Sequence, residues 1–172
     1  DIVVGTSAGS VVGALYAGGM SGFEMQKLAL QMEEGMVLDW TLPNRGVLKG
    51  EALQAFINQK LRNQSIQKLP KPLGVVATDL QSGEMVLFRR GDTGMAVRAS
   101  SAVPGMFQPV EIGGRDYVDG GLTSPVPAQS ARSMGADFVI AVDISNVCRQ
   151  SKLTGTLDVL LQTFALMGRA IS

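Results

Sequence analysis

Short apolar runs of strand length, separated by helical patterns and glycine-rich turns, limit the fold of this chain more than any other feature. The clearest run, residues 73–78 (LGVVAT), is apolar on both of its alternating faces, which is typical of a strand covered on both sides. Apolar strands that alternate with helices predict an α/β fold. We therefore expect three layers, α/β/α, around a mainly parallel central sheet, with residues 1–172 forming a single domain.

Apolar spacing, capping residues and glycines place the individual elements. Expected strands cover residues 2–4, 73–78, 85–88, 110–112, 115–118 and 138–144. Expected helices cover residues 10–17, 22–34, 51–61, 96–102, 127–134 and 157–167. Ser21 and Glu24 form a capping box before the second of these helices, and Gly113-Gly114 predicts a two-residue hairpin turn.

The chain contains no histidine among its 172 residues, of which 45% are apolar and 17% are charged. The apolar fraction is sufficient for the core of one soluble globular domain. The absence of histidine excludes a Ser-His-Asp triad, a Cys-His pair and most zinc sites from this chain. Any hydrolytic chemistry here must use another base, and we expect neither a metal nor another cofactor.

Charge and hydropathy restrict the partners and the location of the protein. The 15 basic and 15 acidic residues balance, and Arg89-Arg90 is too small a basic cluster to follow a phosphate backbone, so we expect no nucleic acid partner. No run reaches the ~20 apolar residues that a membrane span needs. We expect a cytoplasmic protein that contacts membranes at their surface. The start at Asp1, inside a strand, leaves an upstream signal sequence as an open alternative.

Residues 5–9 (GTSAG) match the pattern G-x-S-x-G and lie between an apolar strand and a helix. This is the setting of a nucleophile elbow, in which a tight turn projects Ser7 and small neighbours avoid clashes. The N–H groups of Ala8 and Gly9 would open the following helix, whose positive end favours a developing oxyanion. The other interpretation is a glycine-rich turn in which Ser7 caps the helix, and the motif alone does not decide between the two.

A serine nucleophile needs a base, and in a chain without histidine the candidates are aspartate, glutamate and lysine. Asp119 ends a predicted strand and precedes Gly120 and Gly121. A carboxylate there can accept the serine proton if burial raises its pKa or if the serine is close and well oriented. The other interpretation of Asp119 is an ordinary Asp-Gly turn. Asp79 and Asp143 also end predicted strands, and we interpret both as structural.

Three segments of the chain together resemble the motifs of the patatin-like phospholipases. They are residues 5–9 (GTSAG), residues 99–109 (ASSAVPGMFQP) and residues 119–121 (DGG), which stand in the order and approximate spacing of that family. The resemblance extends over nearly the whole chain and includes residues 46–50 (GVLKG) and 76–80 (VATDL). Three linked motifs are far more specific than a single G-x-S-x-G match.

The resemblance implies a patatin-like fold and a Ser-Asp dyad that hydrolyses fatty-acyl esters of phospholipids or related lipids without a metal. Ser7 matches the family's nucleophile, and Asp119 matches the base that takes the proton of Ser7 and later activates water. An acyl-enzyme forms between these two steps. The supporting positions are Gly5, Ala8 and Gly9 at the elbow, with Ala8 as an oxyanion donor, and Pro104, Gly120 and Gly121 in the other two motifs.

The chain departs from the family pattern at its beginning. The family's first strand and glycine-rich oxyanion loop precede the elbow, and the sequence starts at Asp1, so we expect both to be absent from residues 1–172. Loss of preorganised oxyanion donors typically lowers the rate by about 10²-fold or more, so this chain alone is expected to be weakly active or inactive. The alternative function is a non-catalytic module that binds lipid or protein. Ser124, where the family pattern leads us to expect Asn, is a smaller departure.

Overall fold

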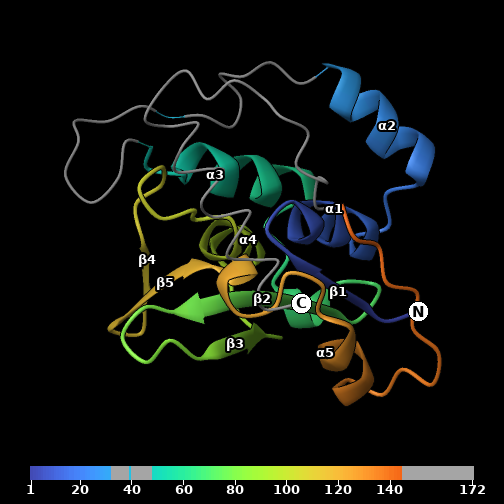
Figure 1. Cartoon of the computed structure of the whole chain (residues 1–172). Helices are drawn as coiled ribbons and strands as arrows, with labels where there is room; N and C mark the ends of the chain where they lie inside the picture. The colour runs from blue at the N-terminus through green and yellow to red at the C-terminus, as the bar shows by residue number, and fades with distance from the viewer. Residues whose placement is uncertain (32–38, 40–47, 145–172) are drawn as a thin grey trace, which may run out of the picture.

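The structure, a computed structural model, describes residues 1–31, 39 and 48–144 (Figure 1). Its strands are β1 (Val3–Thr6), β2 (Leu73–Asp79), β3 (Met85–Phe88), β4 (Val110–Ile112) and β5 (Arg115–Asp119). Its helices are α1 (Ala8–Ala17), α2 (Gly22–Gln31), α3 (Glu51–Lys60), α4 (Thr93–Ser100) and α5 (Ala128–Ser133), with 3₁₀ turns η2 (Ile66–Lys68) and η3 (Gly120–Leu122).

The described strands form one mixed sheet in the order β1-β2-β5-β4, with β3 also paired to β2. β1 and β2 are parallel, whereas the β2–β3, β2–β5 and β4–β5 pairs are antiparallel, so the expectation of a mainly parallel sheet is wrong in this part of the chain. Short turns join β2 to β3 and β4 to β5, and strands joined in this way must run antiparallel. The β1–β2 connection passes through α1, α2 and α3, and these two strands form the parallel pair.

Helices cover both faces of the sheet, as an α/β fold of three layers requires. Helices α1, α3 and α4 lie on one side of the sheet and α5 on the other (Figure 1). A Cβ built on Gly13 of α1 would lie 3.1 Å from Val3, whereas one built on Gly74 would lie 2.7 Å from Sδ of Met134, the residue after α5. Every residue of β2 is buried, which confirms that this apolar run is covered on both faces.

Local sequence signals explain most helix and turn boundaries. The Ser21–Glu24 capping box forms, with the Ser21 N–H donating to the Glu24 carboxylate over 2.8 Å. Gly113 and Gly114 both have positive φ, 63° and 79°, and form the predicted hairpin turn between β4 and β5. Helix α4 begins three residues before the predicted start because the Asp92 carboxylate caps it, accepting from the Met95 N–H over 2.6 Å.

One predicted strand is absent from the structure. Residues 138–144 form no strand, and their large apolar side chains are exposed: Phe138 by 80%, Ile140 by 80%, Val142 by 74% and Ile144 by 71%. The apolar pattern makes these residues suitable for a sheet, but a strand also needs a hydrogen-bonded neighbour, and none of the described strands pairs with this segment. The predicted helix over residues 157–167 lies outside the described residues. No helix in the described part is long and apolar enough to cross a membrane.

Candidate active site

Ser7 occupies a tight turn between β1 and α1. Its backbone has φ 52° and ψ −123°, a conformation that a residue other than glycine adopts only when the surroundings impose it. The Ser7 side chain makes no capping hydrogen bond to α1, and the Ser10 hydroxyl instead donates to the Ser7 carbonyl over 2.6 Å. The interpretation of Ser7 as a helix-capping serine is therefore wrong. The turn leaves the Ser7 hydroxyl available for another partner.

The two glycines of the elbow motif differ in what their positions require. A Cβ on Gly5 would lie 2.3 Å from the backbone oxygen of Gly9, so any other residue at position 5 would force backbone atoms of the turn to move. A Cβ on Gly9 would meet no atom within 4 Å. Close backbone approach accounts for the first glycine of the motif but not for the second.

This difference predicts opposite effects of the two alanine substitutions on stability. Gly5→Ala should lower the free energy of unfolding by about 1–3 kcal/mol, because backbone atoms have to move. Gly9→Ala should leave it unchanged or raise it by up to about 1 kcal/mol, because alanine favours the helix that contains residue 9. Chemical denaturation of both variants beside the wild type measures the effects, and equal losses would contradict the steric argument.

Asp119 ends β5 and directs its carboxylate at Ser7. The Ser7 hydroxyl donates to Oδ2 of Asp119 over 2.6 Å, within the hydrogen-bond distance that the sequence motifs lead us to expect. Oδ1 accepts from the Gly121 N–H over 2.7 Å and caps η3. The Asp-Gly turn and the contact with serine are thus both present, because they use different oxygens of one carboxylate.

The backbone of Asp119 is also held on both sides. Its N–H donates to the carbonyl of Ala102 over 3.0 Å, and its carbonyl accepts from the Thr78 hydroxyl over 3.0 Å. A Cβ on Gly120 would lie 2.3 Å from the carbonyl oxygen of Val76, so glycine at position 120 permits the close approach of this turn to β2. With its side chain and backbone both bonded, Asp119 is fully buried and has little freedom to turn away from Ser7.

Comparison with known proteins agrees with the resemblance in the motifs. The family model for patatin-like phospholipase matches residues 1–132. The chain belongs to the patatin-like phospholipase family. An uncharacterized NTE family protein of Mycobacterium tuberculosis is 35% identical over 145 residues, which cover 83% of this chain and 40% of that protein.

Two further relatives show how this family segment sits in longer proteins. A second uncharacterized NTE family protein of Mycobacterium tuberculosis is 30% identical over 170 residues, covering 98% of this chain and 29% of the relative. Patatin-like phospholipase domain-containing protein 6 of Mus musculus is 34% identical over 154 residues, covering 85% of this chain and 11% of the relative. The chain thus spans less than half the length of each of these relatives.

In this patatin-like chain, burial changes the acidity of Asp119. Desolvation raises the pKa of its carboxyl from 3.8 to about 6, against the smaller lowering effects of the Ser7 and Gly121 hydrogen bonds. At neutral pH the group is mostly ionised, yet its pKa lies close enough to neutrality for it both to accept and to return a proton. Such a value suits a general base.

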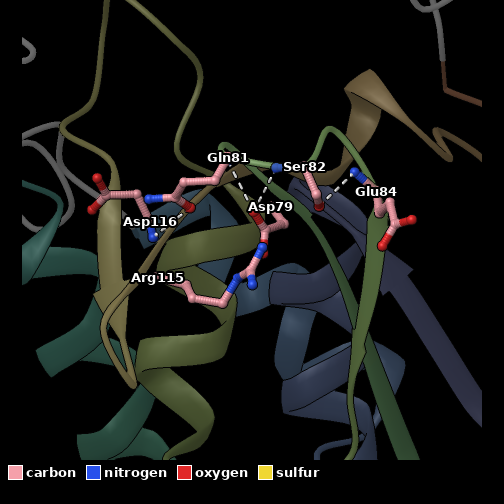
Figure 2. A network of polar contacts seen from close by, with 6 residues as sticks. All are labelled: Asp79, Gln81, Ser82, Glu84, Arg115 and Asp116. Atoms are coloured by element: carbon pink, nitrogen blue, oxygen red, sulfur yellow. Dashed lines mark hydrogen bonds and ion pairs between the residues drawn. The ribbon is translucent and has the colours of Figure 1, made fainter.

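Asp79, which ends the neighbouring strand β2, has the opposite electrostatic environment (Figure 2). Its carboxylate accepts hydrogen bonds from the Arg115 guanidinium and from the N–H groups of Gln81 and Ser82, over 2.9 and 3.0 Å for the last two. The Arg115 guanidinium is the main reason that the pKa of Asp79 falls to about 2. Asp79 therefore stays ionised and joins the β2–β3 turn to β5, which fits a structural role.

Of the other predicted positions, Gly121 bonds the Asp119 carboxylate directly. Ala8 and Gly9 begin α1, and the first N–H bonded within that turn is that of Ser10, which donates to the Ser7 carbonyl over 2.8 Å. Pro104 is exposed in the loop that follows α4. Within the described residues, no group of three or more His, Cys, Asp or Glu is placed to hold a metal ion.

Two residues that support the pair had no assigned role in the sequence analysis. Thr78 bonds the Asp119 carbonyl, and Ser100 accepts a hydrogen bond from the Ser7 N–H over 2.8 Å. Both lie in segments that resemble family motifs, residues 76–80 and 99–109, and that resemblance was the signal that could have pointed to them. Their function depends on contacts between distant parts of the chain, which no local pattern describes.

Proposed function

We propose that the protein is a serine acyl hydrolase that cleaves fatty-acyl esters of phospholipids or related lipids through a Ser7–Asp119 dyad. The observation that carries the proposal is the 2.6 Å hydrogen bond from the Ser7 hydroxyl to a fully buried carboxylate. Family membership supports a lipid ester as the substrate class. The chain has no histidine to act as the base, and Asp119 has the environment that such a role needs.

In the acylation step, Oγ of Ser7 attacks the acyl carbonyl carbon while its proton passes to Oδ2 of Asp119. The tetrahedral intermediate then collapses, the bond between the acyl carbon and the ester oxygen breaks, and the alcohol leaves with the proton from Asp119. The products of this half-reaction are the alcohol and an ester between Ser7 and the fatty acid. Asp119 is again ionised and ready for the second half-reaction.

In the deacylation step, Asp119 takes a proton from a water molecule, whose oxygen attacks the acyl carbon. Collapse of this second intermediate returns the proton to Oγ of Ser7 and releases the fatty acid. In both steps negative charge develops on the carbonyl oxygen of the substrate. The N–H groups of Ala8 and Gly9 begin the ten-residue helix α1, so its positive end supports this charge.

Labelling with an organophosphonate tests the proposal directly. The intact protein is the sample, because this chain spans less than half the length of the relatives described above. We expect covalent phosphonylation of Ser7 and release of fatty acid from soluble short-chain esters, with both lost in Ser7→Ala. Ser21→Ala, which alters an exposed serine of the α2 capping box, is the matched control and should react as the wild type does. A folded wild type that is neither labelled nor active would favour the non-catalytic lipid- or protein-binding module.

A cytoplasmic location and contact with membrane surfaces are also part of the proposal. The membrane contact follows from a lipid substrate. Cell fractionation tests both: the protein should sediment with membranes and be released by a high-salt wash. Recovery from the medium, or retention on membranes after that wash, would contradict this location.

A further inference from the structure

The backbone N–H of the strained residue Ser7 is held by a buried hydroxyl from a distant part of the chain. The Ser7 N–H donates to Oγ of Ser100 over 2.8 Å, and Oγ of Ser100 donates in turn to the Val76 carbonyl over 2.5 Å. Ser100 is fully buried at the end of α4. One hydroxyl thus connects the elbow to β2. A residue in a sparsely populated φ/ψ region costs about 1–3 kcal/mol and keeps that conformation only when surrounding contacts enforce it.

The same end of α4 also holds the proposed base. Two residues after Ser100, the Ala102 carbonyl accepts the backbone N–H of Asp119 over 3.0 Å. The segment that carries both contacts is itself fixed, because Val97, Ala99 and Ala102 are buried in the core. Residues 7 and 119 are far apart in the sequence, and the end of α4 bonds the backbone N–H groups of both.

We propose that Ser100 is a positioning residue, whose hydroxyl locks the backbone of Ser7 so that the end of α4 sets the distance between the Ser7 and Asp119 side chains. This inference rests on the proposed catalytic roles of Ser7 and Asp119. Ser100 acts through Ser7 and has no contact of its own with the Asp119 carboxylate among the hydrogen bonds of the described residues.

Loss of the Ser100 hydroxyl has a distinctive chemical consequence. The Ser7 N–H and the Val76 carbonyl lose their shared partner, so the turn can relax and the Oγ–Oδ2 hydrogen bond of the dyad lengthens. Proton transfer then slows, while the surface that binds substrate stays as it was. The Ser7 hydrogen bond also lowers the pKa of Asp119, so weakening it moves that pKa upward.

The test compares Ser100→Ala with the wild type in the intact protein. We expect kcat to fall by about 10²-fold with KM unchanged, since a displacement of the nucleophile by about 1 Å has an effect of that size. The rate of phosphonate labelling should fall by the same factor, and the final labelled fraction should equal that of the wild type. The acidic limb of the pH–rate profile should move to higher pH.

Thr93→Val is the matched control because Thr93 is a fully buried hydroxyl at the other end of α4. Its Oγ1 donates to the Gln64 carbonyl over 2.7 Å, away from the dyad. This variant should be less stable than the wild type. Its folded molecules should be labelled with the wild-type rate constant, and the acidic limb of its pH–rate profile should not move. Ser100→Cys retains a weakly polar atom at Cβ and should react at a rate between those of the wild type and Ser100→Ala. It also serves as the test variant if Ser100→Ala does not fold.

The outcomes separate this inference from the proposed function. If the wild type is not labelled at Ser7, the proposed function fails and the inference fails with it. The second outcome is that the wild type is labelled and the folded Ser100 variants have the same labelling rate constant and the same acidic limb. Only the positioning role is then overturned. A purely structural residue would reduce only the fraction of protein that can be labelled. If this smaller fraction accounts for the whole loss of activity in the Ser100 variants, the positioning role is also overturned.

Discussion

Asp119→Asn should lower kcat/KM by on the order of 10⁴-fold and yet make the folded protein more stable at pH 8. The loss of activity follows from the removal of the base that bonds Ser7 among the described residues, since general-base catalysis contributes about 10²–10⁴-fold and the proposed dyad acts as a unit. Asparagine has nearly the same shape and keeps an oxygen for the Gly121 N–H. The variant therefore removes the charge with little change to the contacts.

The gain in stability follows from the raised pKa of Asp119. A carboxyl whose pKa rises from 3.8 in the unfolded chain to about 6 in the folded protein binds its proton more tightly when folded. This tighter binding of the proton stabilises the folded protein fully below pH ~3.8, and the stabilisation is lost as the pH rises through about 6. The free energy of unfolding falls by about 3 kcal/mol over this range. Asparagine carries no charge that must be buried, so the variant should exceed the wild type by about this amount at pH 8 and by much less at pH 4.

Urea denaturation of both proteins at pH 4 and pH 8 measures this difference. Asp79→Asn is the matched control, because the pKa of Asp79 is lowered by Arg115 and removal of its charge should destabilise the fold at pH 8. At pH 8, Asp119→Asn should therefore raise the free energy of unfolding, and Asp79→Asn should lower it. An Asp119→Asn variant that is less stable than the wild type at pH 8 would show that the ionised carboxylate does not destabilise the folded protein.

The second large effect is the pH dependence of the activity that we propose for the wild-type protein. In the proposed mechanism the ionised form of Asp119 accepts the Ser7 proton, so kcat/KM should fall about tenfold per pH unit below an acidic limb centred near pH 6. An unperturbed aspartate would place this limb near 3.9, so the displacement measures the burial of the carboxyl. The measurement is a pH–rate profile on a soluble ester, repeated as the rate of phosphonate labelling.

A limb near pH 6 resembles that of a histidine, so its origin has to be assigned by substitution. The residual activity of Asp119→Asn should be flat through pH 6. Enlarging Gly120 is a poor probe of burial, because a Cβ there would lie 2.3 Å from the Val76 carbonyl oxygen and would displace the whole turn. If the limb persists in Asp119→Asn and disappears when a histidine elsewhere in the intact protein is replaced, the dyad mechanism is refuted.

The local elements of the fold could be predicted because they depend on residues close in the sequence. The structure contains three features that neighbouring residues alone explain. These are the apolar run of β2, the capping box at Ser21 and the hairpin turn at Gly113-Gly114. The early start of α4 was missed although Asp92 supplies a local signal, an N-cap carboxylate. Residues 138–144 were predicted as a strand and form none. An apolar pattern makes a segment suitable for a sheet, but it does not provide the neighbouring strand with which the segment must pair.

By itself the sequence determined which residues are available for chemistry: a serine in a glycine-flanked turn, no histidine anywhere in the chain, and Asp119 before two glycines. Only the tertiary structure decided that the Ser7 hydroxyl turns away from helix capping and toward Asp119, and that this carboxyl is buried enough to raise its pKa. It also decided the strand directions and the contacts of Ser100. The physical reason is that hydrogen bonds across more than ninety residues, and the desolvation of a side chain, depend on what packs around a group, which residue type and spacing do not encode.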